Sequence, residues 1–218
     1  RQGLYRWLKQ HRDQITLIFV TGRDLQFIRQ LVSLGDAPRP DYVIGDVGTT
    51  IAGGHYLVPL PELEVDIASR WQNAGPRMRK LLAHEPGIRE QNTPFRYRLS
   101  YYYDPERLQR STLDKIEAAG FDWLLSADTF LDVLPRGVSK GPTLLRLAEH
   151  LDLPRERILT AGDTLNDLSL FETGLPGVAV GNAEPALRER VAGMPNVYLS
   201  TLPGAAGILE AIARHPAL

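Results

Sequence analysis

The sequence predicts an α/β protein whose core is a doubly wound parallel β-sheet, with an α+β segment inserted between the two parts of that core. At both ends of the chain, short apolar runs rich in β-formers alternate with helix-compatible patterns. In the middle, strand and helix patterns mix without that strict alternation. We place the core at residues 1–51 and 132–218 and the inserted segment at 52–131.

Length and composition limit the possible partners and location. The chain has 218 residues, enough for one substantial domain with a smaller insert. Its net charge of −1 gives no electrostatic case for nucleic acid or an anionic membrane as partner. It has no cysteine, which excludes disulfides, thiolate metal sites and cysteine catalysis. We therefore expect a cytoplasmic protein that engages neither nucleic acid nor membrane.

The two ends of the predicted core each alternate strand and helix. At the N-terminus, Leu4, Trp7 and Leu8 share one face of a helix, and residues 16–20 form a continuous apolar run. Such a run is typical of a parallel strand buried on both faces. The other core elements expected are strands at 42–45, 158–161 and 177–180 and helices starting near 25, at 140–150, at 167–171 and at 184–191.

The middle of the chain reads as a separate α+β unit. We expect an extended stretch at 56–61, helices at 63–84 and 105–119, an alternating strand at 95–103 and one or two strands at 122–134. The alternation places Arg96, Arg98, Ser100 and Tyr102 on one face of the strand and aromatic residues with Leu99 on the other. A single-stranded RNA platform is one interpretation. A sheet strand with one face packed on helices is the preferred one.

A glycine followed by hard oxygen ligands ends the third predicted core strand. Gly162 is followed by Asp163, Asn166 and Asp167 in a turn that opens a helix. Carboxylates at the end of a parallel strand, beside a helix N-terminus, suit Mg²⁺ and phosphate together. Asp163 is expected to ligate the metal, Asp167 to hold a metal-bound water and Asn166 to donate to a phosphate oxygen. The alternative is that Asp163 or Thr164 merely caps a helix.

Two further groups could bind a phosphate. Thr21 and Gly22 follow the first predicted strand, where a hydroxyl and free backbone N–H groups form a cradle for phosphate oxygens. Thr21 as a helix cap is the alternative. Lys140 opens a predicted helix, where the helix dipole disfavours a cation unless it neutralises an anion. A solvated lysine is the alternative.

These residues occur in an order that resembles motifs II, III and IV of the haloacid dehalogenase (HAD) superfamily of phosphatases. The inserted segment lies between motifs II and III, so the resemblance implies a Rossmann-like core with a C2-type cap. Within the superfamily, the chain is similar to sucrose-phosphate phosphatase and related sugar-phosphate phosphatases. The stretches that carry this similarity are residues 21–24, 40–48, 90–92, 96–101, 132–135 and 162–172.

The resemblance also implies a mechanism and shows what the chain lacks. It implies Mg²⁺ as cofactor, Thr21 and Lys140 as catalytic residues, and phosphate bound by Thr21, Gly22, Lys140 and Asn166. The family's motif I, Asp-x-Asp, supplies the nucleophile and the general acid, and no residue here replaces it. Because the sequence has no initiator methionine and Arg1 lies inside the expected first helix, truncation is the simplest interpretation. A chain that truly lacks these residues is the other, and this polypeptide alone is expected to be inactive.

Four further polar residues are candidates for contact with the substrate. Asp46, Gln91, Asn92 and Arg96 are expected to contact a sugar phosphate, against the alternatives of loop-capping for Asp46 and ordinary surface polarity for the rest. A second hypothesis is a non-catalytic phosphosugar-binding domain that regulates a partner, such as a glycosyltransferase on the same polypeptide. A dinucleotide-binding domain is excluded because no Gly-x-Gly-x-x-Gly follows a strand.

Overall fold

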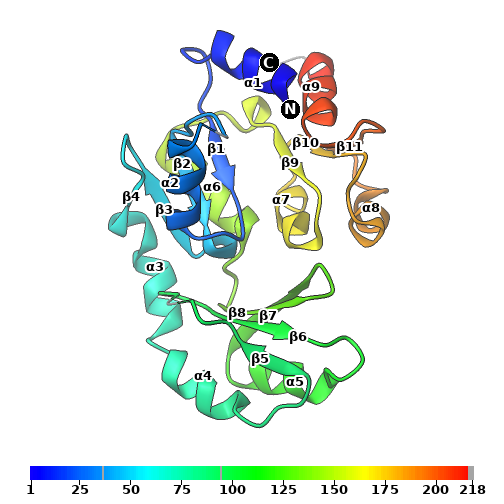
Figure 1. Cartoon of the computed structure of the whole chain (residues 1–218). Helices are drawn as coiled ribbons and strands as arrows, with labels where there is room; N and C mark the ends of the chain where they lie inside the picture. Colours follow the sequence, from blue (N-terminus) through cyan, green and yellow to red (C-terminus); the bar gives the residue numbers. More distant parts are fainter. Residues whose placement is uncertain (36, 94, 216–218) are drawn as a thin grey trace.

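The computed structural model describes residues 1–35, 37–93 and 95–215, which form three sheets flanked by helices (Figure 1). The strands are β1 (Ile18–Val20), β2 (Tyr42–Gly45), β3 (Thr50–Gly53), β4 (Val58–Pro59), β5 (Ile88–Glu90), β6 (Leu99–Tyr103), β7 (Phe121–Ser126), β8 (Phe130–Pro135), β9 (Thr160–Gly162), β10 (Gly177–Ala179) and β11 (Val197–Leu199). The helices are α1 (Gln2–Gln10), α2 (Leu25–Ser33), α3 (Pro61–Trp71), α4 (Gly75–Leu82), α5 (Arg110–Ala118), α6 (Lys140–His150), α7 (Leu168–Phe171), α8 (Pro185–Val191) and α9 (Gly204–Arg214).

The first sheet, in the order β1-β2-β3-β4, has helices on both faces. β1 runs parallel to β2, whereas β3 and β4 fold back antiparallel. Successive side chains of β2 point to opposite faces. Val43 packs with Leu25 and Ile28 of α2, and Ile44 packs with Leu144 and Leu147 of α6. The expected α/β class with helices on both sides is therefore confirmed.

The second sheet, in the order β11-β10-β9, is fully parallel. Phe171 of α7 and Leu187 of α8 pack with Ala179 of β10, and α9 lies against the same strand. α1 contacts α9, so the N-terminal and C-terminal helices lie together in Figure 1.

The two core sheets do not join into one. Within the described residues, β1 pairs only with β2, and β9 pairs only with β10. The separation does not contradict the predicted doubly wound core, but it corrects the expectation that the strand at 16–20 is buried on both faces. Only residues 18–20 form β1, and all three are half-buried because one flank of the strand has no paired neighbour.

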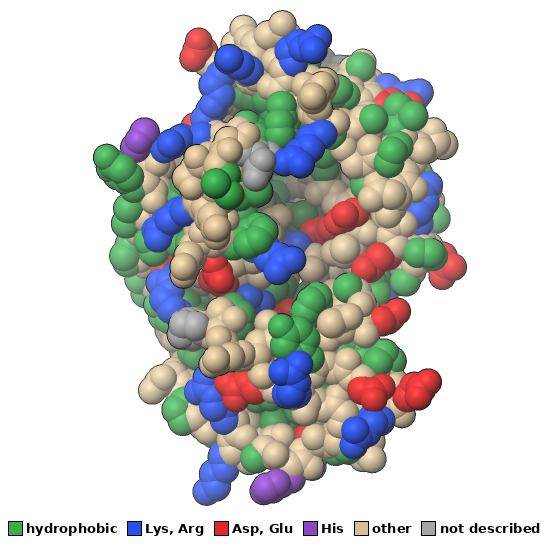
Figure 2. All heavy atoms as spheres, in the orientation of Figure 1, with side chains coloured by type: hydrophobic (Ala, Val, Ile, Leu, Met, Phe, Trp, Pro, Cys, Tyr) green, Lys and Arg blue, Asp and Glu red, His purple; other side chains and the backbone are tan. Residues whose placement is uncertain are grey.

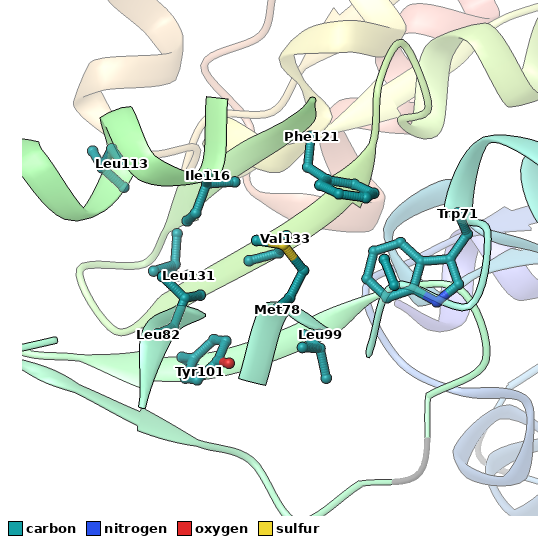
Figure 3. Close-up of a cluster of buried hydrophobic side chains, with 11 residues drawn as sticks. Trp71, Met78, Leu82, Leu99, Tyr101, Leu113, Ile116, Phe121, Leu131 and Val133 are labelled. Carbon is teal, nitrogen blue, oxygen red and sulfur yellow. The ribbon is translucent and has the colours of Figure 1, made fainter. Parts of the chain in front are cut away.

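The third sheet, in the order β5-β6-β8-β7, is antiparallel and has its own apolar core. Figure 3 shows Met78 of α4, Ile116 of α5 and Leu131 of β8 meeting in this cluster. The predicted boundaries between residues 51 and 52 and between 131 and 132 fall inside β3 and β8. We propose instead that the second unit covers residues 61–135, from the start of α3 to the end of β8.

Several elements differ from the sequence predictions. The helix expected at 63–84 is two helices, α3 and α4, because Gln72 and Asn73 both adopt positive φ angles between them. Of the stretch expected to be extended at 56–61, residues 58 and 59 form β4, whereas residues 56 and 57 belong to a turn. β3, β5, β11 and α9 were not predicted. No helix of the described residues is long and apolar enough to cross a membrane.

Gly48 allows the first sheet and α6 to approach closely. It ends the short 3₁₀ turn η1 (Asp46–Gly48) with a φ of +102°, and a Cβ on it would lie 2.4 Å from the carbonyl carbon of Ser139. Its own carbonyl accepts a hydrogen bond from Thr143 Oγ1 of α6 at 2.7 Å. The backbone before Lys140 therefore rests directly on this glycine.

We expect Gly48→Ala to lower the free energy of unfolding by about 2–4 kcal/mol, from left-handed strain plus overpacking. Gly54→Ala is the matched control, because Gly54 has a φ of +74° but nothing within 4 Å of an added Cβ. It should cost only the strain, about 1–2 kcal/mol. Urea denaturation of both variants measures the difference. Equal losses would contradict the close approach at Gly48.

Candidate active site

The loop after β1 leaves the Thr21 side chain available to a ligand. Asp24 caps α2 by accepting a hydrogen bond from Phe27 N at 2.8 Å, so the alternative role of Thr21 as the cap of this helix is wrong. Thr21 Oγ1 accepts from Arg23 N at 3.1 Å. Its hydroxyl proton therefore remains to be donated, as a phosphate oxygen requires.

Lys140 is buried, which excludes the alternative of a solvated lysine. Only 3% of the residue is exposed. Its Nζ donates to Asp167 Oδ1 at 2.6 Å and to Asn166 Oδ1. A buried ammonium needs a paired charge and further hydrogen bonds, and this site supplies both. The lysine therefore brings a fixed positive charge to the N-terminus of α6.

The turn after β9 is built around the Asp167 carboxylate. Asp167 Oδ2 accepts from the backbone N–H groups of Asp163 at 2.9 Å and Thr164 at 3.1 Å. Gly162 makes this possible, because a Cβ on it would lie 2.5 Å from Asp167 Cβ. Asp167 thus orients Lys140 and the turn, and both of its oxygens already have partners. Its expected contact with a metal-bound water stays a prediction.

Asp163, the carboxylate expected to ligate a metal, lines the pocket. Partial burial raises the pKa of Asp163, and the negative charge of Asp167 raises it further. A divalent cation would relieve both effects. Mg²⁺ binds through one or two carboxylates together with waters and phosphate oxygens, which fits this donor set. No three His, Cys, Asp or Glu side chains gather into a metal-binding group in the part of the chain that the structure describes.

These residues line one pocket of about 640 Å³. Figure 2 shows the molecule hollowed between the core and the third sheet, with charged side chains of both signs around the hollow. The pocket brings together most of the residues expected from the sequence, which are Thr21, Gly22, Gln91, Lys140, Asp163, Asn166 and Asp167. Ends of β1 and β9 meet the third sheet here, as ligand sites in open α/β folds require.

Three residues expected to contact substrate lie outside the pocket lining. Asn92 is exposed. Arg96 forms a two-pronged ion pair with the buried Glu64 of α3, at 2.8 and 2.9 Å. Asp46 is buried and accepts from Thr50 Oγ1 at 2.6 Å. Burial raises the pKa of Asp46, although the positive charge of Arg98 opposes the rise. Substrate contact by these residues remains untested.

Arg98 lines the pocket and was not singled out by the sequence. It lies just before β6, and its side chain is 6% exposed. It donates to Asp132 Oδ1 at 2.8 Å, to the Gly22 carbonyl at 3.0 Å and to Asp46 Oδ1 at 3.4 Å. The alternating pattern placed it correctly opposite the helix-packed face. No sequence signal identified its partners, which are 34 to 76 residues away.

Comparison with known proteins identifies the family of the chain. The family model described as Sucrose-6F-phosphate phosphohydrolase matches residues 1–215. Glucosylglycerol-phosphate synthase of Pseudomonas anguilliseptica is 36% identical over 97% of this chain, and sucrose-phosphatase 2 of Nicotiana tabacum is 30% identical over 94%. The crystal structure of the Synechocystis sp. PCC6803 sucrose-phosphatase with sucrose and phosphate superposes with a TM-score of 0.86, at 26% identity, over 98% of this chain and 90% of that one.

The chain spans only part of these curated relatives, 28% of the synthase and 52% of the tobacco protein. The match nevertheless covers nearly all of the present residues, including each of the three motifs around the pocket. The chain therefore belongs to the sucrose-6F-phosphate phosphohydrolase family, within the HAD superfamily.

Proposed function

We propose that this chain carries the phosphate- and metal-binding part of a Mg²⁺-dependent phosphatase that hydrolyses a sugar phosphate. The substrate is sucrose 6-phosphate or a related glycosyl phosphate. The observation that carries the proposal is the convergence of Thr21, Lys140 and Asp163 on one pocket that the third sheet closes from the other side. Anion-binding and cation-binding groups together suit phosphoryl transfer, in which positioning and electrostatics supply most of the rate.

Each side chain has a role that its contacts support. Thr21 and the Gly22 N–H would donate to phosphoryl oxygens, since Thr21 Oγ1 accepts from Arg23 N and its proton has no acceptor among the residues that the structure describes. Lys140 would stabilise negative charge on the phosphoryl group, and Asn166 would orient it. Asp163 would hold Mg²⁺, which offsets negative charge on the phosphate when bound. Closure of the third sheet over the pocket would exclude bulk water.

The attacking carboxylate is proposed to lie outside these 218 residues, as the first residue of a motif I Asp-x-Asp. It would bond to phosphorus while the bond to the sugar oxygen breaks, giving an aspartyl-phosphate and a sugar protonated by the second Asp. Water would then release phosphate and regenerate the carboxylate. The separate edges of β1 and β9, which meet at the pocket, support a strand between them that carries this motif.

We also propose a partner for this chain and keep one alternative to the phosphatase function. A glycosyl-transfer partner or domain is supported by the similarity to the longer glucosylglycerol-phosphate synthase. The alternative function is a non-catalytic phosphosugar-binding domain.

A phosphate-release screen of the full-length polypeptide against a panel of sugar phosphates, with and without Mg²⁺, separates these functions. Release that requires Mg²⁺ supports the phosphatase. Saturable binding of a sugar phosphate without release supports the binding domain.

In the full-length protein, Asp163→Ala should nearly abolish Mg²⁺-dependent phosphate release, because the pocket loses the carboxylate placed for the metal. Asp13→Ala is the control, since Asp13 is an exposed residue in the turn after α1. The measurements are turnover and its Mg²⁺ titration. Near-normal turnover of the Asp163 variant would refute the metal assignment.

Lys140→Met should weaken binding of inorganic phosphate or vanadate by roughly 10- to 100-fold, because a charged hydrogen bond is lost. It should also destabilise the fold by about 3–5 kcal/mol, since Asp167 is left buried without its cation. The double variant Lys140→Met/Asp167→Asn removes that stranded charge and should recover stability without recovering affinity. Calorimetric titration and urea denaturation measure the two effects. Unchanged phosphate affinity in the stable double variant would rule out the role of Lys140.

A further inference from the structure

The guanidinium of Arg98 links the third sheet to two turns of the core, the one after β1 and the one after β2. Arg98 belongs to the third sheet, where its Nη1 is fixed by Asp132 of β8. Ser100 also donates to Asp132, so this carboxylate is held in place. The other terminal nitrogen, Nη2, reaches across to the core, to the Gly22 carbonyl and to Asp46. These bonds therefore cross from the third sheet to the core.

The environment of Arg98 indicates more than structural packing. Its guanidinium carbon lies 3.7 Å from the centre of the Phe95 ring, which covers one side of it. Among the described residues, no acceptor reaches its buried Nε. A buried N–H without a partner costs about 1–3 kcal/mol, so this placement is not one that stability alone would select.

The core turn that Arg98 contacts is strained. Asp46 and Val47 have φ angles of +52° and +59°, and a β-branched residue rarely adopts this conformation. The turn is held by hydrogen bonds from Asp46 N to the Arg23 carbonyl and from Val47 N to the Thr21 carbonyl. Strained backbone persists where the surroundings impose it, and it concentrates at functional sites. Here the same turn touches the phosphate loop and Arg98.

We propose that Arg98 is a positioning residue that couples closure of the third sheet to the Thr21–Gly22 phosphate loop, and so favours sugar phosphates over small phosphate esters. It acts through the Gly22 carbonyl and Asp46 rather than on phosphorus. A substrate whose sugar contacts the third sheet draws Arg98 onto the core and benefits from the closed arrangement. A small ester that contacts only the core gains little from it.

This inference rests on the proposed phosphatase function, so the full-length parent protein is first assayed with 4-nitrophenyl phosphate and sucrose 6-phosphate. Arg98→Met is then compared with the parent. The kcat/KM for sucrose 6-phosphate should fall roughly 10- to 100-fold, as for loss of hydrogen bonds to a charged group. The value for 4-nitrophenyl phosphate should change less than about threefold. Arg89→Met, at an exposed arginine of the same sheet, is the control and should change neither.

Arg98→Lys keeps the charge but cannot reproduce the planar fork that reaches three acceptors. It should show the same fall in the ratio of the two kcat/KM values, at smaller size. It also carries the test if Arg98→Met fails to fold because Asp132 is left buried without a cation. Equal losses for both substrates, or no loss for either, would overturn the proposal.

Small-angle X-ray scattering distinguishes failure of this inference from failure of the proposed function. In saturating inorganic phosphate, Arg98→Met should have a larger radius of gyration than the parent and the Arg89→Met control, because the third sheet is released. Identical radii would overturn the coupling. If the parent hydrolyses neither ester, the proposed function fails, and the scattering comparison still decides whether Arg98 links the two units.

Discussion

The buried ion pair between Lys140 and Asp167 is the interaction on which the rest of the site depends. The lysine opens α6, which covers the first sheet, and the aspartate ends the turn that follows β9 of the second sheet. Since β1 and β9 do not pair with each other, this contact joins the two halves of the core at the pocket. Close approach of Gly141 to the Ser169 carbonyl, where a Cβ would lie 1.9 Å from the oxygen, brings the two elements together.

The pair also explains how a charged side chain can be kept out of water at the edge of the pocket. Taking an ammonium and a carboxylate into the interior costs several kcal/mol each, and their attraction compensates only if the remaining hydrogen bonds are made. Besides the ion pair, Lys140 Nζ donates a hydrogen bond to Asn166 Oδ1, and Asp167 Oδ2 accepts hydrogen bonds from two backbone N–H groups. The positive charge of Lys140 is therefore fixed before any ligand arrives, which is the condition for electrostatic preorganisation.

Local sequence was sufficient to bring out several residues that line the pocket and insufficient for those that depend on distant partners. Thr21, Lys140 and Asp163 could be placed because each follows a strand or opens a helix that is visible in the apolar pattern. β3 was missed because its hairpin needs left-handed backbone at Asp46 and Val47, which these residue types do not indicate.

For residues whose partners are distant in sequence, the alternating pattern could assign at most a face of the predicted strand. Arg96 was expected to contact substrate, but its guanidinium donates to Glu64, which lies 32 residues earlier and was not considered. Arg98 was assigned a face but no role, because its partners come from β8 and from two core turns. The predicted helix at 63–84 missed the break at Gln72 and Asn73. The Gly75-Pro76 pair, which begins α4, was the sequence signal for that break.

The insertion of one unit within another also constrains the order in which the chain can fold. Thr143 must reach Gly48, 95 residues away, whereas all four strands of the third sheet lie within residues 88–135. Contacts between residues close in sequence form first, because closing a long loop costs more entropy. During synthesis the first sheet must therefore wait, with one face uncovered, until α6 has emerged. The third sheet can by then be complete, and its folded ends hold the two core segments near each other.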